Sequence, residues 1–152
     1  QQAGYQTVAF DLSPYMGRIA KHKLAKNKLV QPFVRGSAFQ LPFANASFSA
    51  IVSTFPTDFI IQPETLNEAY RVLESDGKLI VVLNGIFTGG GGVKSFLEWL
   101  YRITGQRDNA NDTGHTKQYF EGYGFDVETA DIPCKNSLAQ LVILTKNNNK
   151  QD

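Results

Sequence analysis

The segment Thr7-Val8-Ala9-Phe10-Asp11-Leu12-Ser13-Pro14 decides the fold class of this chain. A short apolar run ends at Asp11, and a helical pattern follows at once, with Ser13 as an N-cap and Pro14 in the first turn. An acidic residue between a strand and a helix is typical of the position where open α/β folds bind ribose hydroxyls. The alternative is a solvated carboxylate that the dipole of the following helix favours.

Strands and helices alternate through the rest of the chain. We predict strands at residues 32–34, 49–54 and 79–83, helices at 63–77, 93–103 and 117–122, and a closing hairpin of 125–132 with 138–145. Asp76-Gly77 is expected to end the second helix, and Gly122 or Gly124 the last one. This order predicts an α/β fold with a Rossmann-like, doubly wound, mostly parallel sheet and a C-terminal antiparallel hairpin. The run Leu79–Leu83 predicts a strand covered on both faces.

Composition excludes several classes of function. The 152 residues suit one domain, predicted over residues 1–146, with a disordered polar tail at 147–152. The net charge of +1 argues against a nucleic-acid partner, and the basic face of the first helix is interpreted as solvated surface. A single cysteine favours a reducing, cytoplasmic location, and no apolar run is long enough to span a bilayer. Two separated histidines predict no metal site.

Three predicted strand ends could share one edge of the sheet. Ligands of doubly wound sheets bind outside the carboxyl ends of the strands, where Asp11, Gly36 and Ser53 would lie. Gly36 would let the backbone approach a flat ligand, and the residues after it could contact an adenine edge. The alternative for this second segment is an ordinary turn.

The glycine run Gly89–Gly92 does not have the spacing of a phosphate-binding loop, because Val93 separates it from Lys94. We interpret it as a flexible lid. No Gly-x-Ser-x-Gly elbow is present, so the sequence offers no nucleophile for acyl transfer.

Four segments, in family order, resemble the class I S-adenosylmethionine-dependent methyltransferases, particularly the branch acting on small molecules, quinones or lipids. They are residues 8–16, 35–48, 67–80 and 122–125. The resemblance extends over about residues 4–146. It implies S-adenosyl-L-methionine as cofactor and a small-molecule methyl acceptor as substrate.

The resemblance also implies the cofactor contacts. Asp11 would hold the ribose hydroxyls, and the segment 53–55 would lie beneath the methionine part. The full expected set is Asp11, Leu12, Ser13, Met16, Gly36, Ser37, Ala38, Phe39, Ser53, Thr54 and Phe55. No catalytic residue is assigned, although Asp58 and His115 are candidates for a general base.

The chain departs from the family pattern in two respects. Ser37 and Ser49 stand where the family usually has Asp, and the family's first strand, Gly-rich turn and first helix would precede Gln1. We therefore expect an N-terminally truncated domain that binds S-adenosylmethionine weakly or not at all, while its parent is a methyltransferase. The inner sheet edge left exposed would allow a homodimer.

Two other interpretations stay open. The first is a non-catalytic dimerisation or scaffold module derived from the methyltransferase fold. The second is a nicotinamide dinucleotide domain, because Asp11 suits that ribose as well. The segments 36–43 and 68–77 are not features of that second class.

Overall fold

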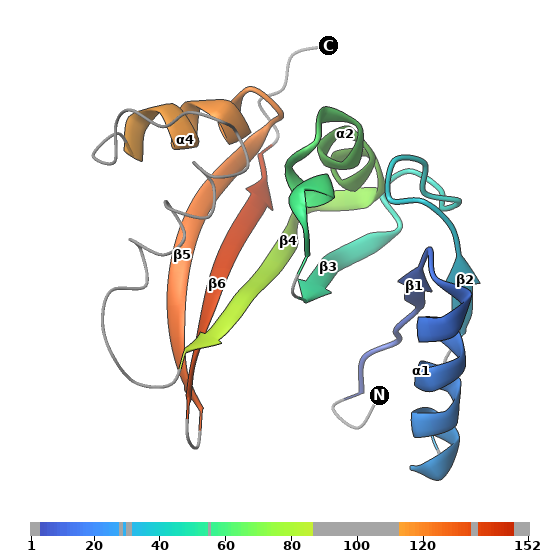
Figure 1. The fold of residues 1–152 in the computed structure, drawn as a ribbon. Helices are drawn as coiled ribbons and strands as arrows, with labels where there is room; N and C mark the ends of the chain where they lie inside the picture. The colour runs from blue at the N-terminus through green and yellow to red at the C-terminus, as the bar shows by residue number, and fades with distance from the viewer. Residues whose placement is uncertain are drawn as a thin grey trace. The chain divides into compact units, whose positions relative to one another are not determined.

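The first strand, turn and helix form where the sequence predicts them (Figure 1). The computed structural model describes residues 4–27, 29, 32–54, 56–86, 113–134 and 137–147. They belong to two units, residues 1–42 and residues 43–152, which we describe separately. The predicted glycine lid and the helix at 93–103 lie outside the described residues.

The first unit is a strand–helix–strand element. Strand β1 (Ala9–Asp11) pairs in parallel with β2 (Phe33–Arg35), so that Asp11 lies opposite Arg35. Helix α1 (Pro14–Lys26) connects them. The Ser13 hydroxyl accepts a hydrogen bond from the Met16 amide at 3.4 Å, which confirms the predicted cap. Strand β2 begins and ends one residue later than the predicted range 32–34.

The second unit contains a sheet of four strands in the order β3-β4-β6-β5. Strands β3 (Phe48–Thr54) and β4 (Leu73–Ile86) are parallel. Strands β5 (Phe125–Cys134) and β6 (Ser137–Lys146) are antiparallel to each other, and β6 is antiparallel to β4. The predicted C-terminal hairpin is therefore confirmed.

The core of the second unit lies between the sheet and its short helices. These helices are η1 (Asp58–Ile61), α2 (Pro63–Val72) and α4 (Thr113–Glu121). Apolar residues from all three helices pack against alternate residues of the strands. The buried cluster consists of Ile60, Ile61, Leu66, Ala69, Leu73, Leu79, Val81, Phe120, Phe125, Val142 and Leu144. Burial of this apolar face stabilises the unit.

Strand β4 differs in burial from the prediction. Leu79 and Val81 are buried in the core, whereas Ile80 and Val82 on the opposite face are half-buried. The predicted burial is therefore confirmed for the face of Leu79 and Val81 but not for the face of Ile80 and Val82.

The predicted end of α2 was wrong. The helix ends at Val72, and Leu73 is already extended, with φ −75° and ψ 139°. Leu73 is fully buried and pairs with Phe48, so strand pairing overrides the Asp76-Gly77 stop signal. Asp76 and Gly77 instead lie at an irregularity in the pairing of β4 with β3, where Asp76 has a φ of 60°. A Cβ at Gly77 would lie 2.8 Å from the Glu74 carbonyl oxygen, which explains the glycine.

The structure also decides how α4 ends. Gly124, and not Gly122, has a left-handed backbone, with φ 82°. The Gly124 amide donates to the Glu121 carbonyl at 2.9 Å and leads the chain directly into β5.

Candidate cofactor site

The Asp11 carboxylate lies half-buried at the carboxyl end of β1. Its Oδ1 accepts a hydrogen bond from the Ser13 amide at 2.7 Å. Within the described part of the chain, no other hydrogen bond to this carboxylate is formed. One carboxylate oxygen is therefore fixed by the turn into α1, and the other remains available to a ligand hydroxyl.

The two strand ends of the first unit are joined at this point. The Gly36 amide donates to the Asp11 carbonyl at 3.3 Å, and Arg35 Nε donates to the Leu12 carbonyl at 3.1 Å. The structure thus places Asp11 beside Gly36, as the prediction requires.

Three apolar members of the expected site are exposed in the first unit. Leu12 is 62% exposed, Met16 50% and Phe39 49%. Met16 is therefore not a core residue. Exposed apolar side chains in the same unit as the Asp11 carboxylate suit a ligand that combines a flat ring with hydroxyl groups.

The loop after Gly36 is a hydrogen-bonded turn. The Phe39 amide donates to the Ser37 hydroxyl oxygen at 3.2 Å, and the Gln40 amide donates to the Ser37 carbonyl at 3.1 Å. The turn itself uses the Phe39 N–H, and contact of Phe39 with an adenine edge stays a prediction. The Ala38 N–H forms no hydrogen bond among the described residues and keeps this role as a prediction.

The glycine at position 36 has a packing explanation. A Cβ there would lie 2.9 Å from Cζ of the Phe10 ring, so any side chain would collide with β1. Contact between the Gly36 backbone and a ligand stays a prediction.

The remaining expected residues belong to the second unit. Ser53 and Thr54 end β3 opposite Val81 and Val82 of β4. Ser53 is half-buried and Thr54 is exposed. Phe55 and the side chain of His115 lie outside the described residues, and Asp58 is exposed at the start of η1.

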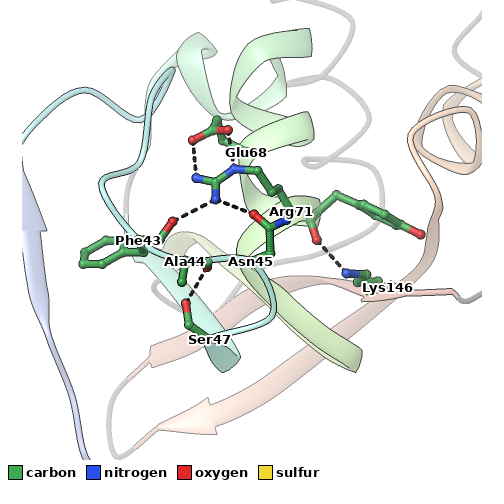
Figure 2. A network of polar contacts seen from close by, with 8 residues as sticks. Phe43, Ala44, Asn45, Ser47, Glu68, Arg71 and Lys146 are labelled. Atoms are coloured by element: carbon green, nitrogen blue, oxygen red, sulfur yellow. Dashed lines mark hydrogen bonds and ion pairs between the residues drawn. The ribbon is translucent and has the colours of Figure 1, made fainter. Parts of the chain in front are cut away.

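A polar cluster at the end of α2 was missed by the sequence reasoning (Figure 2). The Arg71 guanidinium forms a bidentate ion pair with Glu68, at 2.7 Å from Nε and 2.8 Å from Nη2. Its Nη1 donates to the Phe43 carbonyl at 2.8 Å and to Asn45 Oδ1 at 2.9 Å. The hydrogen bond to Glu68 raises the pKa of Arg71, although burial acts in the opposite direction. Only the i, i+3 spacing of the ion pair is visible in the sequence.

Lys146 of β6 completes the end of α2 on the other side. Its Nζ donates to the carbonyls of Tyr70 and Leu73, at 2.8 and 2.7 Å, and lies 4.3 Å from the centre of the Tyr70 ring. These carbonyls stabilise the ammonium group, whereas burial lowers the pKa of Lys146. Lys146 thus takes the helix-terminating role that the sequence assigned to Gly77.

The described residues lack two other features. They contain no group of three or more His, Cys, Asp or Glu side chains placed to hold a metal ion. They also contain no helix that is long and apolar enough to cross a membrane.

Two solved structures with a similar fold are described as methyltransferases. One from Methanosarcina mazei, described as S-adenosylmethionine-dependent, has a TM-score of 0.61 and 18% identity, with 95% of this chain and 84% of that chain covered. The aminoglycoside resistance methyltransferase NpmB1 has a TM-score of 0.63 and 14% identity, with coverage of 94% and 77%. These similarities establish the Rossmann-like fold of the class I methyltransferases.

The sequence establishes the family. Residues 1–81 match the methyltransferase domain family, to which this chain belongs. The demethylmenaquinone methyltransferase of Clavibacter sepedonicus is 32% identical over 80 residues, which are 52% of this chain and 32% of that enzyme. Its counterpart from Deinococcus radiodurans is 32% identical over 78 residues, with coverage of 51% and 32%. The matched part of this chain thus spans about a third of these relatives. The comparisons do not favour the scaffold interpretation.

Proposed function

We propose that the protein transfers a methyl group from S-adenosylmethionine to a small-molecule acceptor. The observation that carries this proposal is the Asp11 carboxylate, held by the Ser13 amide at the carboxyl end of β1 with one oxygen available. Membership of the methyltransferase domain family supports it independently.

The residues around Asp11 suit the adenosine part of the cofactor. A carboxylate accepts hydrogen bonds from two neighbouring ribose hydroxyls, and such charge-assisted bonds are about twice as strong as neutral ones. Leu12, Met16 and Phe39 offer exposed apolar surface for a purine ring. The Ala38 amide offers a donor for one of its nitrogen atoms. The same chemistry would suit any adenosine ligand, and membership of the methyltransferase domain family is what supports the methyl donor.

S-Adenosylmethionine supplies an electrophilic methyl group on a positively charged sulfur. The protein residues would act by holding the cofactor, and the positioning of two reactants can contribute ~7–11 kcal/mol to lowering a barrier. Contact of Ser53 and Thr54, which end β3, with the methionine part stays a prediction from the resemblance to the family. No residue is assigned a proton transfer.

For the acceptor we propose a quinone-type aromatic compound. The support is the identity of 32% with two enzymes named demethylmenaquinone methyltransferases. Both similarities cover about half of this chain, so the acceptor is tested separately from the cofactor.

The cofactor assignment is tested by calorimetric titration of the whole protein with S-adenosylmethionine. D11N preserves the shape of the side chain but removes its charge, and we expect it to weaken binding roughly 10- to 100-fold. E74Q is the matched control, because Glu74 is an exposed carboxylate on β4. Equal affinities of wild type and D11N would refute the role of Asp11, and no binding of S-adenosylmethionine by the full-length parent would refute the proposed function.

The acceptor assignment is tested by mass spectrometry of the reaction products. Incubation with a demethylated quinol and S-adenosylmethionine is expected to add 14 mass units to the quinol, as one methyl group replaces hydrogen. A protein that binds the cofactor but does not methylate the quinol would refute this acceptor and leave the cofactor assignment intact.

A further inference from the structure

Arg71 makes more contacts than the end of a helix requires. The last turn of α2 is already closed by the main chain: the Ala46 amide donates to the Arg71 carbonyl at 2.9 Å, and the Ser47 amide to the Val72 carbonyl at 2.8 Å. These bonds satisfy carbonyls that the helix leaves without partners. The guanidinium adds a second attachment, to the Phe43 carbonyl and the Asn45 side chain, while Glu68 holds it from the opposite side (Figure 2).

The segment that Arg71 holds is under backbone strain. Ala46 has a φ of 49°, a left-handed conformation that non-glycine residues rarely adopt. Such a conformation persists where the surrounding contacts over-determine it, and it often marks a part of the chain with a functional constraint. The Ser47 hydroxyl, which donates to the Ala44 carbonyl at 2.8 Å, adds to these contacts.

The held segment continues directly from the expected adenine loop, residues 36–42. Only three residues, Gln40, Leu41 and Pro42, separate Phe39 from Phe43. The proline ring fixes φ at position 42, and the residue before a proline is restricted to extended conformations. An attachment at the Phe43 carbonyl therefore limits the conformations open to the loop before it.

We propose that Arg71 is a positioning residue for cofactor binding: its guanidinium fixes the end of the loop 36–42 and so pre-organises that loop. This inference rests on the proposed function. Arg71 does not contact the cofactor in this account. It acts through the Phe43 carbonyl, and it reduces the conformational freedom that the loop would otherwise lose on binding.

The test compares Arg71 with a residue that supports the same helix end but not the loop. R71M removes the contacts to Phe43 and Asn45, whereas K146M removes only contacts to Tyr70 and Leu73. We expect R71M to raise the dissociation constant for S-adenosylmethionine roughly 10-fold, and K146M less than about 2-fold, at similar losses of stability. Equal effects on binding would show that Arg71 is only structural and would overturn the proposal.

Two further variants separate the ion pair from the loop attachment. E68Q leaves Arg71 and its bonds to the loop in place, so we expect an affinity within about 3-fold of wild type. R71K retains the charge but cannot reproduce the planar set of four bonds, so we expect it to resemble R71M. Wild-type affinity in R71K would refute the geometric argument. In turnover, R71M is expected to raise KM for the cofactor and leave kcat unchanged.

Hydrogen exchange without cofactor gives a readout that does not depend on the proposed function. We expect R71M to accelerate exchange of the amides of Phe39, Ala46 and Ser47, which bond within the loop or to α2. The hairpin of β5 and β6 should keep its protection. Unchanged exchange at the three amides would overturn the proposal, whereas accelerated exchange in a protein that does not bind the cofactor would refute the proposed function alone.

Discussion

Substitution of Gly124 by alanine tests how the second unit closes. Gly124 has a φ of 82°, and a Cβ there would lie 2.5 Å from Cε2 of the Tyr70 ring. The ring has little freedom to move, because its hydroxyl donates to the Asn147 carbonyl at 3.1 Å and it forms a T-shaped contact with the Phe125 ring, with centroids 5.6 Å apart. Lys146 also lies over the ring face.

The magnitude follows from two terms. A left-handed conformation costs a non-glycine residue ~1–2 kcal/mol, and overpacking against a fixed ring adds ~1–3 kcal/mol. We expect G124A to lower the free energy of unfolding by about 3 kcal/mol, measured by urea titration followed by circular dichroism. G122A is the matched control: Gly122 lacks a positive φ, and its Cβ would meet only carbonyl oxygens at 3.2 Å or more. It should change stability by less than about 1 kcal/mol.

A double-mutant cycle separates the two terms. Y70L removes the ring, so G124A in that background should lose only the conformational part, and the cycle should give a coupling of about 1 kcal/mol or more. The reasoning is refuted if G124A and G122A are equally stable. A coupling of zero would refute the overpacking term, because the collision with Tyr70 would then have no energetic effect.

Two further predictions concern side chains that hold the second unit together. K146M should lower the free energy of unfolding by about 1–2 kcal/mol, because charged hydrogen bonds are lost while the burial cost of the ammonium is relieved. The control K78M, at an exposed lysine of β4, should change the free energy of unfolding by less than about 0.5 kcal/mol. Equal losses for K146M and K78M in urea titrations would contradict the stabilising role of Lys146. Burial raises the pKa of Tyr119 from 10.0 to about 12, so the folded protein retains the phenol proton that the unfolded chain releases. The stability that Tyr119 adds over Y119F should therefore be complete below pH 10 and fall by about 1 kcal/mol toward pH 12, after allowance for partial exposure. If the stability difference between wild type and Y119F does not change with pH in unfolding titrations from pH 8 to 12, the raised pKa of Tyr119 is refuted.

The elements predicted well are those with strong local signals. Ser13 and Pro14 define the start of α1 because capping depends on neighbouring residues only. The hairpin of β5 and β6 follows from two alternating runs separated by a short turn. Asp11 was identified because a strand end followed at once by a helix is a local feature as well.

The errors arose where distant residues compete with local signals. Asp76-Gly77 resembles a helix stop, yet α2 ends at Val72 because Leu73 pairs with Phe48 and is buried in the core.

The order of residues along this chain was sufficient for its alternating elements, its family and the carboxylate at position 11, because each depends on short stretches of sequence. The three-dimensional fold alone decided which side chains close α2. Arg71 reaches partners 26 and 28 residues away, and Lys146 reaches carbonyls 76 and 73 residues away. No spacing rule connects positions so far apart, since they meet only after the strands have paired and the core has formed.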